Sequence, residues 1–120
     1  MTQNIDINNV INLDDLQAAK TVLKSRFGEM IDNYTEDMEL YLKSINEGLD
    51  NGDLKMVYTS AHPMKSASAS LGVIGVSELA AEIEAMARDS QDIEAIQTSV
   101  KSLTELLECV IQYMHKMNES

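Results

Sequence analysis

Apolar residues recur three and four positions apart through most of this chain, a spacing typical of helices that bury one face. One long run of this kind extends from Phe27 to Leu49. Gly and Pro number 5 and 1, which is too few for the turns that a β fold of this length would need. The sequence therefore predicts an all-α protein. The clearest run lies near the C-terminus and comprises Ile93, Ile96, Val100, Leu103, Leu107, Val110, Met114 and Met117.

Capping residues divide the first half of the chain into helices. Asn12 is a predicted N-cap, and it begins a short helix that extends to Leu23. The long helix that follows should end at Gly52, because glycine adopts the left-handed conformation of a C-cap. Asp53 is then the predicted N-cap of a helix that ends at Gly72.

Two further helices complete the predicted fold. One carries the apolar residues from Val76 to Met86, and either Asp89 or Ser90 could cap the last helix. Short connections favour antiparallel packing of successive helices. We expect an up-down antiparallel four-helix bundle over residues 12–118, with the short helix as an N-terminal lid and residues 1–11 as a flexible tail.

The charge of the chain excludes two classes of function. With 20 acidic and 9 basic residues the formal net charge is −11, which repels nucleic-acid phosphates and anionic lipid. The single cysteine, Cys109, cannot form an intrachain disulfide or a cysteine-based metal cluster, and we interpret it as a core residue. No signal sequence or long apolar run is present, so we expect a cytoplasmic protein without membrane contact.

The candidate site is a histidine within the helix that precedes Gly72. His62 shares a helical face with Thr59, Ser66 and Ala69, whereas the apolar residues of this helix lie on the other side. The imidazole should therefore be exposed, where a neutral ring nitrogen can act as a nucleophile. Lys65, one turn further on, could supply positive charge to a phosphoryl group.

Acidic residues are absent from the surroundings of this histidine in the sequence. The 24 residues from Leu54 to Ser77 contain no Asp or Glu, although an even distribution of 20 acids over 120 residues would place about four there. Lys55 and Lys65 are the charged residues of this window. We therefore expect the surface around His62 to be the part of the protein that is least hostile to an anion.

The segment from Ala61 to Gly72, which reads A-H-P-M-K-S-A-S-A-S-L-G, resembles the core pattern of the histidine-containing phosphotransfer domain family. That pattern is roughly A-H-x-[LM]-K-G-[SA]-[SA]-x-x-[LF]-G, and the resemblance extends to the helix pattern of nearly the whole chain, including Ile83-Glu84. Such domains are relays in multistep phosphorelays. They accept a phosphoryl group from the aspartate of one receiver domain and pass it to another.

The resemblance implies a role for each motif residue. His62 would carry the phosphoryl group and Lys65 would stabilise its charge. Thr59, Ser66 and Ala69 would form the partner-docking face, whereas Ser68 and Gly72 would have structural roles in helix packing and helix ending.

The resemblance also implies the setting in which the chain works. It would have no kinase activity of its own and no cofactor or metal, since Mg²⁺ would be held by the partner receiver domain. Its partners would be response-regulator receiver domains and a hybrid sensor kinase, and it would act as a monomer. The initiating Met and the polar ends favour a free-standing protein over a segment of a hybrid kinase.

Two residues depart from the family pattern, and other interpretations stay open. Ser66 replaces the more common Gly, and Pro63 removes a helical hydrogen bond to the Thr59 carbonyl, so the helix either bends or breaks there. His62 could instead be an incidental surface histidine of a helical adaptor that binds receiver or kinase domains without carrying phosphate. His115, near the end of the last helix, fits a helix-capping role.

Overall fold

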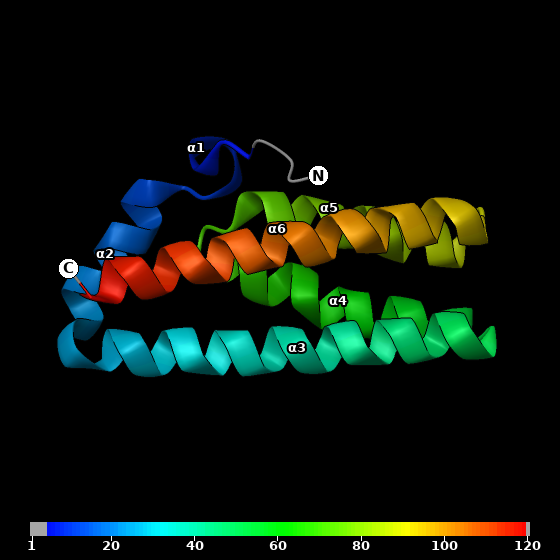
Figure 1. Cartoon of the computed structure of the whole chain (residues 1–120), viewed down its shortest axis with the longest axis horizontal. Helices are drawn as coiled ribbons and strands as arrows, with labels where there is room; N and C mark the ends of the chain where they lie inside the picture. Colours follow the sequence, from blue (N-terminus) through cyan, green and yellow to red (C-terminus); the bar gives the residue numbers. More distant parts are fainter. Residues whose placement is uncertain (1–4, 120) are drawn as a thin grey trace.

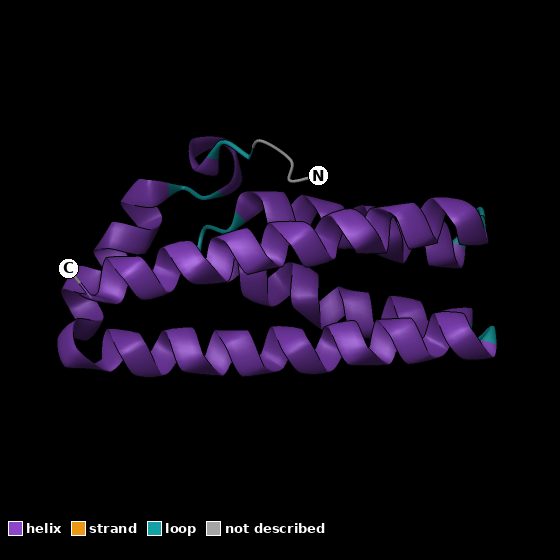
Figure 2. Ribbon diagram, in the orientation of Figure 1, coloured by secondary structure: helices purple, strands orange, loops and turns teal. Residues whose placement is uncertain are grey.

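The computed structural model describes residues 5–119, and in this part of the chain every regular element is a helix. Figure 2 shows these helices joined by short loops. The elements are α1 (Ile7–Val10), α2 (Leu13–Leu23), the 3₁₀ turn η1 (Lys24–Arg26), α3 (Phe27–Asn51), α4 (Leu54–Ser70), α5 (Ile74–Arg88) and α6 (Ile93–Glu119).

The four long helices form the bundle that the sequence predicted. Each of α3, α4 and α5 packs against the next helix, and α6 packs against α3 to close the bundle (Figure 1). Short turns between them make successive helices antiparallel. The short helix α2 lies at one end of the bundle, where Lys20 Nζ donates to the Met117 carbonyl of α6 at 2.7 Å. The fold is thus an up-down four-helix bundle with a short N-terminal helix, as expected.

The four predicted caps at Asn12, Gly52, Asp53 and Gly72 are present in the structure. Gly52 has a φ of +67° and Gly72 a φ of +77°, both in the left-handed region. The Asn12 side chain accepts from the Asp15 backbone N–H at 3.2 Å, and Asp53 accepts from the Met56 N–H at 3.1 Å. These four residues therefore mark the beginning of α2, the end of α3 and both ends of α4.

The predicted cap of the last helix was wrong. Asp92, not Asp89 or Ser90, caps α6, because its carboxylate accepts from the Ala95 backbone N–H at 3.2 Å. Asp89 instead belongs to the end of α5, where its N–H donates to the Ala85 carbonyl at 2.9 Å.

The assignment of residues 1–11 to a flexible tail was also wrong for the part that the structure describes. Residues 7–10 form α1, and both Val10 and Ile11 are buried in the core. Gly75 makes this contact possible, since a Cβ at that position would lie 2.9 Å from Val10 Cγ1. The packed domain therefore begins before residue 12, while residues 1–4 lie outside the described part of the chain.

Gly72 joins the end of α4 to the beginning of α2. Its carbonyl accepts from the Asn12 backbone N–H at 2.7 Å, and a Cβ on Gly72 would lie 2.9 Å from Asp15 Cβ. We expect Gly72→Ala to lower the free energy of unfolding by about 2 to 3 kcal/mol, since the positive φ and the clash act together. Urea unfolding measures this loss.

Gly52 provides a matched control for that substitution. It also has a positive φ, but a Cβ there would meet no atom within 4 Å. Gly52→Ala should therefore cost about 1 kcal/mol, the backbone strain alone. Equal losses for the two variants would show that the contact with Asp15 adds nothing.

A buried hydrogen bond between α3 and α4 lies within the largely apolar core. Tyr34 and Ser68 are both buried, and their hydroxyl oxygens lie 2.7 Å apart. Burial raises the pKa of Tyr34 to about 12 from its ordinary 10.0, although the hydrogen bond to Ser68 acts in the opposite direction.

This raised pKa predicts a loss of stability at alkaline pH. Above pH 10 the unfolded chain loses the phenolic proton while the folded protein keeps it, so the stabilisation from Tyr34 is complete below pH 10 and declines as the pH rises to about 12. The decline should amount to about 2 to 3 kcal/mol. Urea unfolding of the wild-type protein and of Tyr34→Phe across this range measures it, and parallel pH profiles would contradict it.

Candidate functional site

His62 lies on the exterior of α4, as the sequence predicted. Its side chain is 57% exposed, and Thr59, Ser66 and Ala69 on the same face are exposed as well. The adjacent proline does not interrupt α4, which runs continuously from Leu54 to Ser70. The possibility that the helix breaks and restarts at Pro63 is therefore excluded, and the imidazole is borne by a regular helix.

A buried carboxylate from the neighbouring helix contacts this imidazole. Glu84 of α5 has a side chain that is 7% exposed, and its Oε2 lies 2.8 Å from His62 Nδ1. Its Oε1 accepts from Lys65 Nζ at 2.8 Å. Arg88 Nη2 lies 3.5 Å from Oε2, one helical turn further along α5. One carboxylate thus binds three groups that are or can become cationic.

The ionisation of Glu84 follows from these partners. Burial acts to raise the pKa of Glu84, but the hydrogen bonds and positive charges of Lys65 and His62 outweigh it, so the pKa lies below its ordinary value of 4.5. Glu84 is therefore a carboxylate at neutral pH. A carboxylate can only accept, so the His62 nitrogen that faces it carries the hydrogen.

This arrangement determines which imidazole nitrogen can react. Because Nδ1 donates to Glu84, a neutral His62 has its unshared electron pair on Nε2. With more than half of the side chain exposed, Nε2 is the atom that a partner can reach from solvent. The site therefore presents an oriented nucleophile at the surface of α4.

Lys65 lies where the sequence predicted, but it is already paired. Its side chain is 35% exposed, and its ammonium is bound to Glu84. The Ser77 hydroxyl donates to the Lys65 backbone carbonyl at 2.9 Å, which joins α4 to α5 beside the site. Lys65 is thus positioned next to His62 through a shared carboxylate.

Ser68 and Gly72, the two residues with predicted structural roles, lie in the core and just after the end of α4. Ser68 is fully buried and hydrogen-bonded to Tyr34, and Gly72 ends α4 in the left-handed conformation. The Ser66 hydroxyl lies 3.5 Å from the His62 carbonyl, and the Thr59 hydroxyl donates to the Lys55 carbonyl at 2.8 Å. Both hydroxyls are thus turned back onto the helix, which leaves a low surface of small side chains around the imidazole.

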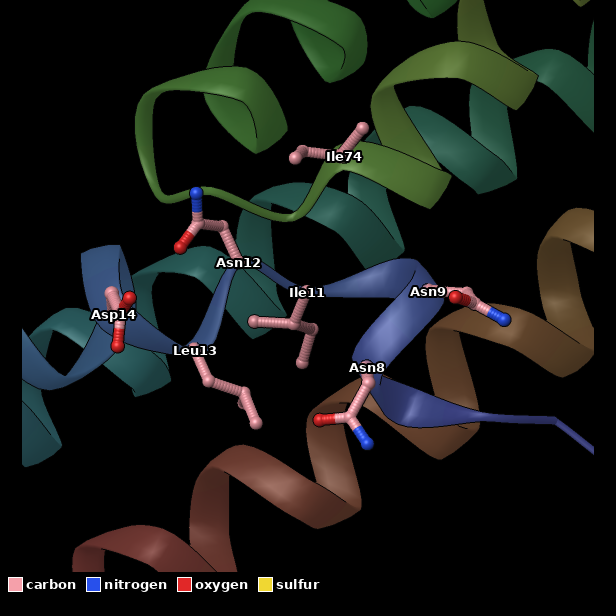
Figure 3. Close-up of a pocket in the computed structure, with 7 residues that line it drawn as sticks. All are labelled: Asn8, Asn9, Ile11, Asn12, Leu13, Asp14 and Ile74. Atoms are coloured by element: carbon pink, nitrogen blue, oxygen red, sulfur yellow. The ribbon is translucent and has the colours of Figure 1, made fainter.

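The pocket drawn in Figure 3 does not include His62. It has a volume of about 310 Å³ and lies between α1, the beginning of α2 and Ile74 of α5. Asparagines and aliphatic side chains line it, with Asp14 as its one titratable residue. No group of three or more His, Cys, Asp or Glu residues within the described chain could hold a metal ion, and none of its helices is both long and apolar enough to cross a membrane.

Comparison with known protein families matches residues 29–113 to the Hpt domain. This range covers more than two thirds of the sequence and includes His62, Lys65 and Glu84. The chain belongs to the Hpt domain family. No curated protein matches it at a significant level.

A solved Hpt structure has the same fold. The chain is similar to histidine-containing phosphotransfer protein B (HptB) from Pseudomonas aeruginosa PAO1, with a TM-score of 0.84 and 18% sequence identity. The match covers 91% of this chain and 94% of that one. The Hpt helical bundle is therefore conserved in shape over nearly the whole length of both chains.

Two residues of this Hpt site were not predicted as functional. Glu84 is part of the family resemblance but had no predicted role, and Arg88 had none either. Their spacing, an acid four residues before an arginine on one helix, was the available signal. The acid-free stretch from Leu54 to Ser77, on which the expectation of a surface least hostile to an anion was based, does not keep every acid away from His62 in space, because Glu84 comes from α5. It is a single carboxylate and it is paired with cations.

Proposed function

We propose that this Hpt domain is a phosphorelay intermediate. It accepts a phosphoryl group on His62 from the phosphoaspartate of one receiver domain and passes it to the aspartate of another. One observation carries the proposal: an exposed imidazole whose Nδ1 is held by a buried carboxylate, which leaves Nε2 free to attack.

The transfer step is balanced without an added acid or base. The Nε2 electron pair forms a bond to phosphorus while the bond between phosphorus and the aspartyl oxygen breaks, and the leaving group is the aspartate carboxylate. The ring then carries a hydrogen on Nδ1 and the phosphoryl group on Nε2, so it is positively charged. Glu84 accepts from that Nδ1 and stabilises the charge, as a carboxylate stabilises the imidazolium of a catalytic triad.

Other residues of the site assist phosphoryl transfer and docking in this scheme. Lys65 shifts part of its interaction from Glu84 to the phosphoryl oxygens, which carry most of the charge in a loose transition state. Thr59, Ser66 and Ala69 form the face on which a receiver domain docks, because their small side chains allow close approach. Mg²⁺ belongs to the receiver domain in this scheme. The Hpt chain acts as a cytoplasmic monomer without kinase activity, and the phosphoryl group comes from a hybrid sensor kinase.

Phosphoryl transfer between purified proteins tests the proposal. A receiver domain labelled on its aspartate should transfer the label to this chain, in a linkage that is labile in acid and stable in base. Adding a second, unlabelled receiver domain should then remove the label from the chain. A complex that forms without any transfer of label would favour the alternative, a helical adaptor that binds receiver or kinase domains without carrying phosphate.

A further inference from the structure

Arg88 lies beside the site in a position that the transfer scheme has not used. It projects from α5 one turn after Glu84, and its side chain is 54% exposed. Within the described residues its contacts are the 3.5 Å approach to Glu84 Oε2 and a stack over the Tyr58 ring, with the guanidinium carbon 4.8 Å from the ring centre. Tyr58 lies four residues before His62, so both belong to the same side of α4.

Its interaction with Glu84 is the loosest of the three. Lys65 and His62 approach the carboxylate to 2.8 Å, a hydrogen-bond distance, whereas 3.5 Å is too long for a strong hydrogen bond. A guanidinium has five N–H donors, and Glu84 faces at most one or two of them. Arg88 therefore keeps donors that can bind a further anion without first leaving a strong partner.

The balance of formal charge also calls for a second cation. Before transfer, Glu84 faces the full charges of Lys65 and Arg88, so the cluster has one surplus positive charge when His62 is neutral. A phosphoryl dianion on a protonated ring adds one net negative charge, which this surplus neutralises. Without Arg88 the cluster would be neutral before transfer and negative after it, in a chain whose net charge is already −11.

We propose that Arg88 is a second phosphoryl-binding cation of this site and that Tyr58 is its positioning residue. The proposal deepens the function proposed above and rests on it. When His62 is phosphorylated, the ring Nδ1–H stays on Glu84 and the guanidinium turns its unused donors to the phosphoryl oxygens. The Tyr58 ring keeps it beside the imidazole, since cations bind the face of an aromatic ring at this distance.

The rate of loading from phosphoramidate tests this proposal without a partner protein. In this reaction the P–N bond of phosphoramidate breaks, ammonia leaves, and a new bond forms between phosphorus and His62 Nε2. We expect Arg88→Gln to slow loading by about tenfold, as the loss of a cation that contacts the phosphoryl group should. The chain has two arginines, and Arg26, which is exposed and paired with Glu29, is the matched control. Arg26→Gln removes the same charge and should change the rate by less than about twofold.

Two substitutions of Tyr58 separate its ring from its hydroxyl group. Tyr58→Leu should slow loading by about 2- to 5-fold, the worth of an exposed cation–π contact. Tyr58→Phe keeps the ring face and should restore the wild-type rate. The ³¹P chemical shift of the phosphohistidine should also move in Arg88→Gln and Tyr58→Leu, because it reports groups bound to the phosphoryl oxygens, and stay unchanged in Arg26→Gln and Tyr58→Phe.

The outcomes distinguish failure of this proposal from failure of the proposed function. A wild-type protein that takes no phosphoryl group on His62 from phosphoramidate would remove both. Normal loading of the wild-type protein, with Arg88→Gln and Arg26→Gln equal in rate and in ³¹P shift, would overturn the role of Arg88. A Tyr58→Phe variant as slow as Tyr58→Leu would overturn the role of the aromatic ring.

Discussion

Replacing His62 with glutamine is expected to abolish phosphoryl transfer to this protein while leaving its fold intact. Glutamine has no nucleophilic nitrogen, so label from a phosphorylated receiver domain should fall to the background level. The amide can still donate to Glu84 Oε2, and the side chain is mainly exposed. The free energy of unfolding should therefore change by less than about 1 kcal/mol. Transfer of label and urea unfolding, measured on the same preparation, check both expectations.

The second histidine of the chain is the matched control for this variant. His115 lies on α6, which is not one of the two helices that form the site. His115→Gln should accept label at the wild-type rate. Label retained by His62→Gln, or lost in His115→Gln, would place the phosphoryl group on another residue and overturn the proposed function.

The second large effect is expected at Glu84. Glu84→Ala removes the acceptor that holds His62 Nδ1–H, so the ring populates both neutral tautomers and loses the charge that stabilises its protonated form. We expect transfer to slow by about 10- to 100-fold. Stability should fall by about 1 to 3 kcal/mol, below the full cost of breaking a buried pair, because Lys65 and Arg88 are exposed enough to be hydrated.

The exposed acid Glu82, on the same helix, is the control for a change of charge alone. Glu82→Ala should alter stability by less than about 0.5 kcal/mol and leave transfer unchanged.

Nitrogen NMR of the His62 ring measures its tautomer directly. The hydrogen should reside on Nδ1 in the wild-type protein and be shared between the two nitrogens in Glu84→Ala. A ring with its hydrogen on Nε2 in the wild-type protein would contradict the mechanism.

Acid titration provides a further measurement on the same residue. The pKa of Glu84 is lower in the folded protein than its ordinary 4.5, so its stabilisation is complete above that value and is lost as the pH falls through the folded pKa. Wild-type stability should therefore fall more steeply below pH 4.5 than that of Glu84→Gln. Equal acid profiles would show that Glu84 is not stabilised as an anion.

Most of the fold could be predicted from the sequence because its limits are set by local chemistry. Glycine at a left-handed C-cap and aspartate or asparagine at an N-cap act within one helical turn, which is why Gly52, Asp53 and Gly72 were assigned correctly. Helix α1 could not be predicted in this way. It has four residues and therefore no period, and its burial depends on the space left by Gly75, far along the chain.

The part of the site that lies on α4 could be predicted from the sequence, but the contact between α4 and α5 could not. The exposure of His62 follows from the register of α4, which the apolar residues of that helix define. The contact with Glu84 depends on which face of α5 meets α4, and spacing within one helix carries no information on that point. Glu84 also lies among the positions that an apolar pattern assigns to the interior, so an acid there indicated a partner, but not which one.

The hydrogen bond between Tyr34 and Ser68 has a consequence for the direction in which His62 points. It joins α3 to α4 at one buried spot, and so it helps the apolar residues of α4 to fix the rotation of this helix about its long axis. Consecutive residues of an α-helix lie about 100° apart around its axis. A shift of α4 by one residue relative to α3 would therefore turn the imidazole away from Glu84 and from the face on which a receiver domain is proposed to dock. A buried hydroxyl pair thus helps to keep the reactive nitrogen at the surface.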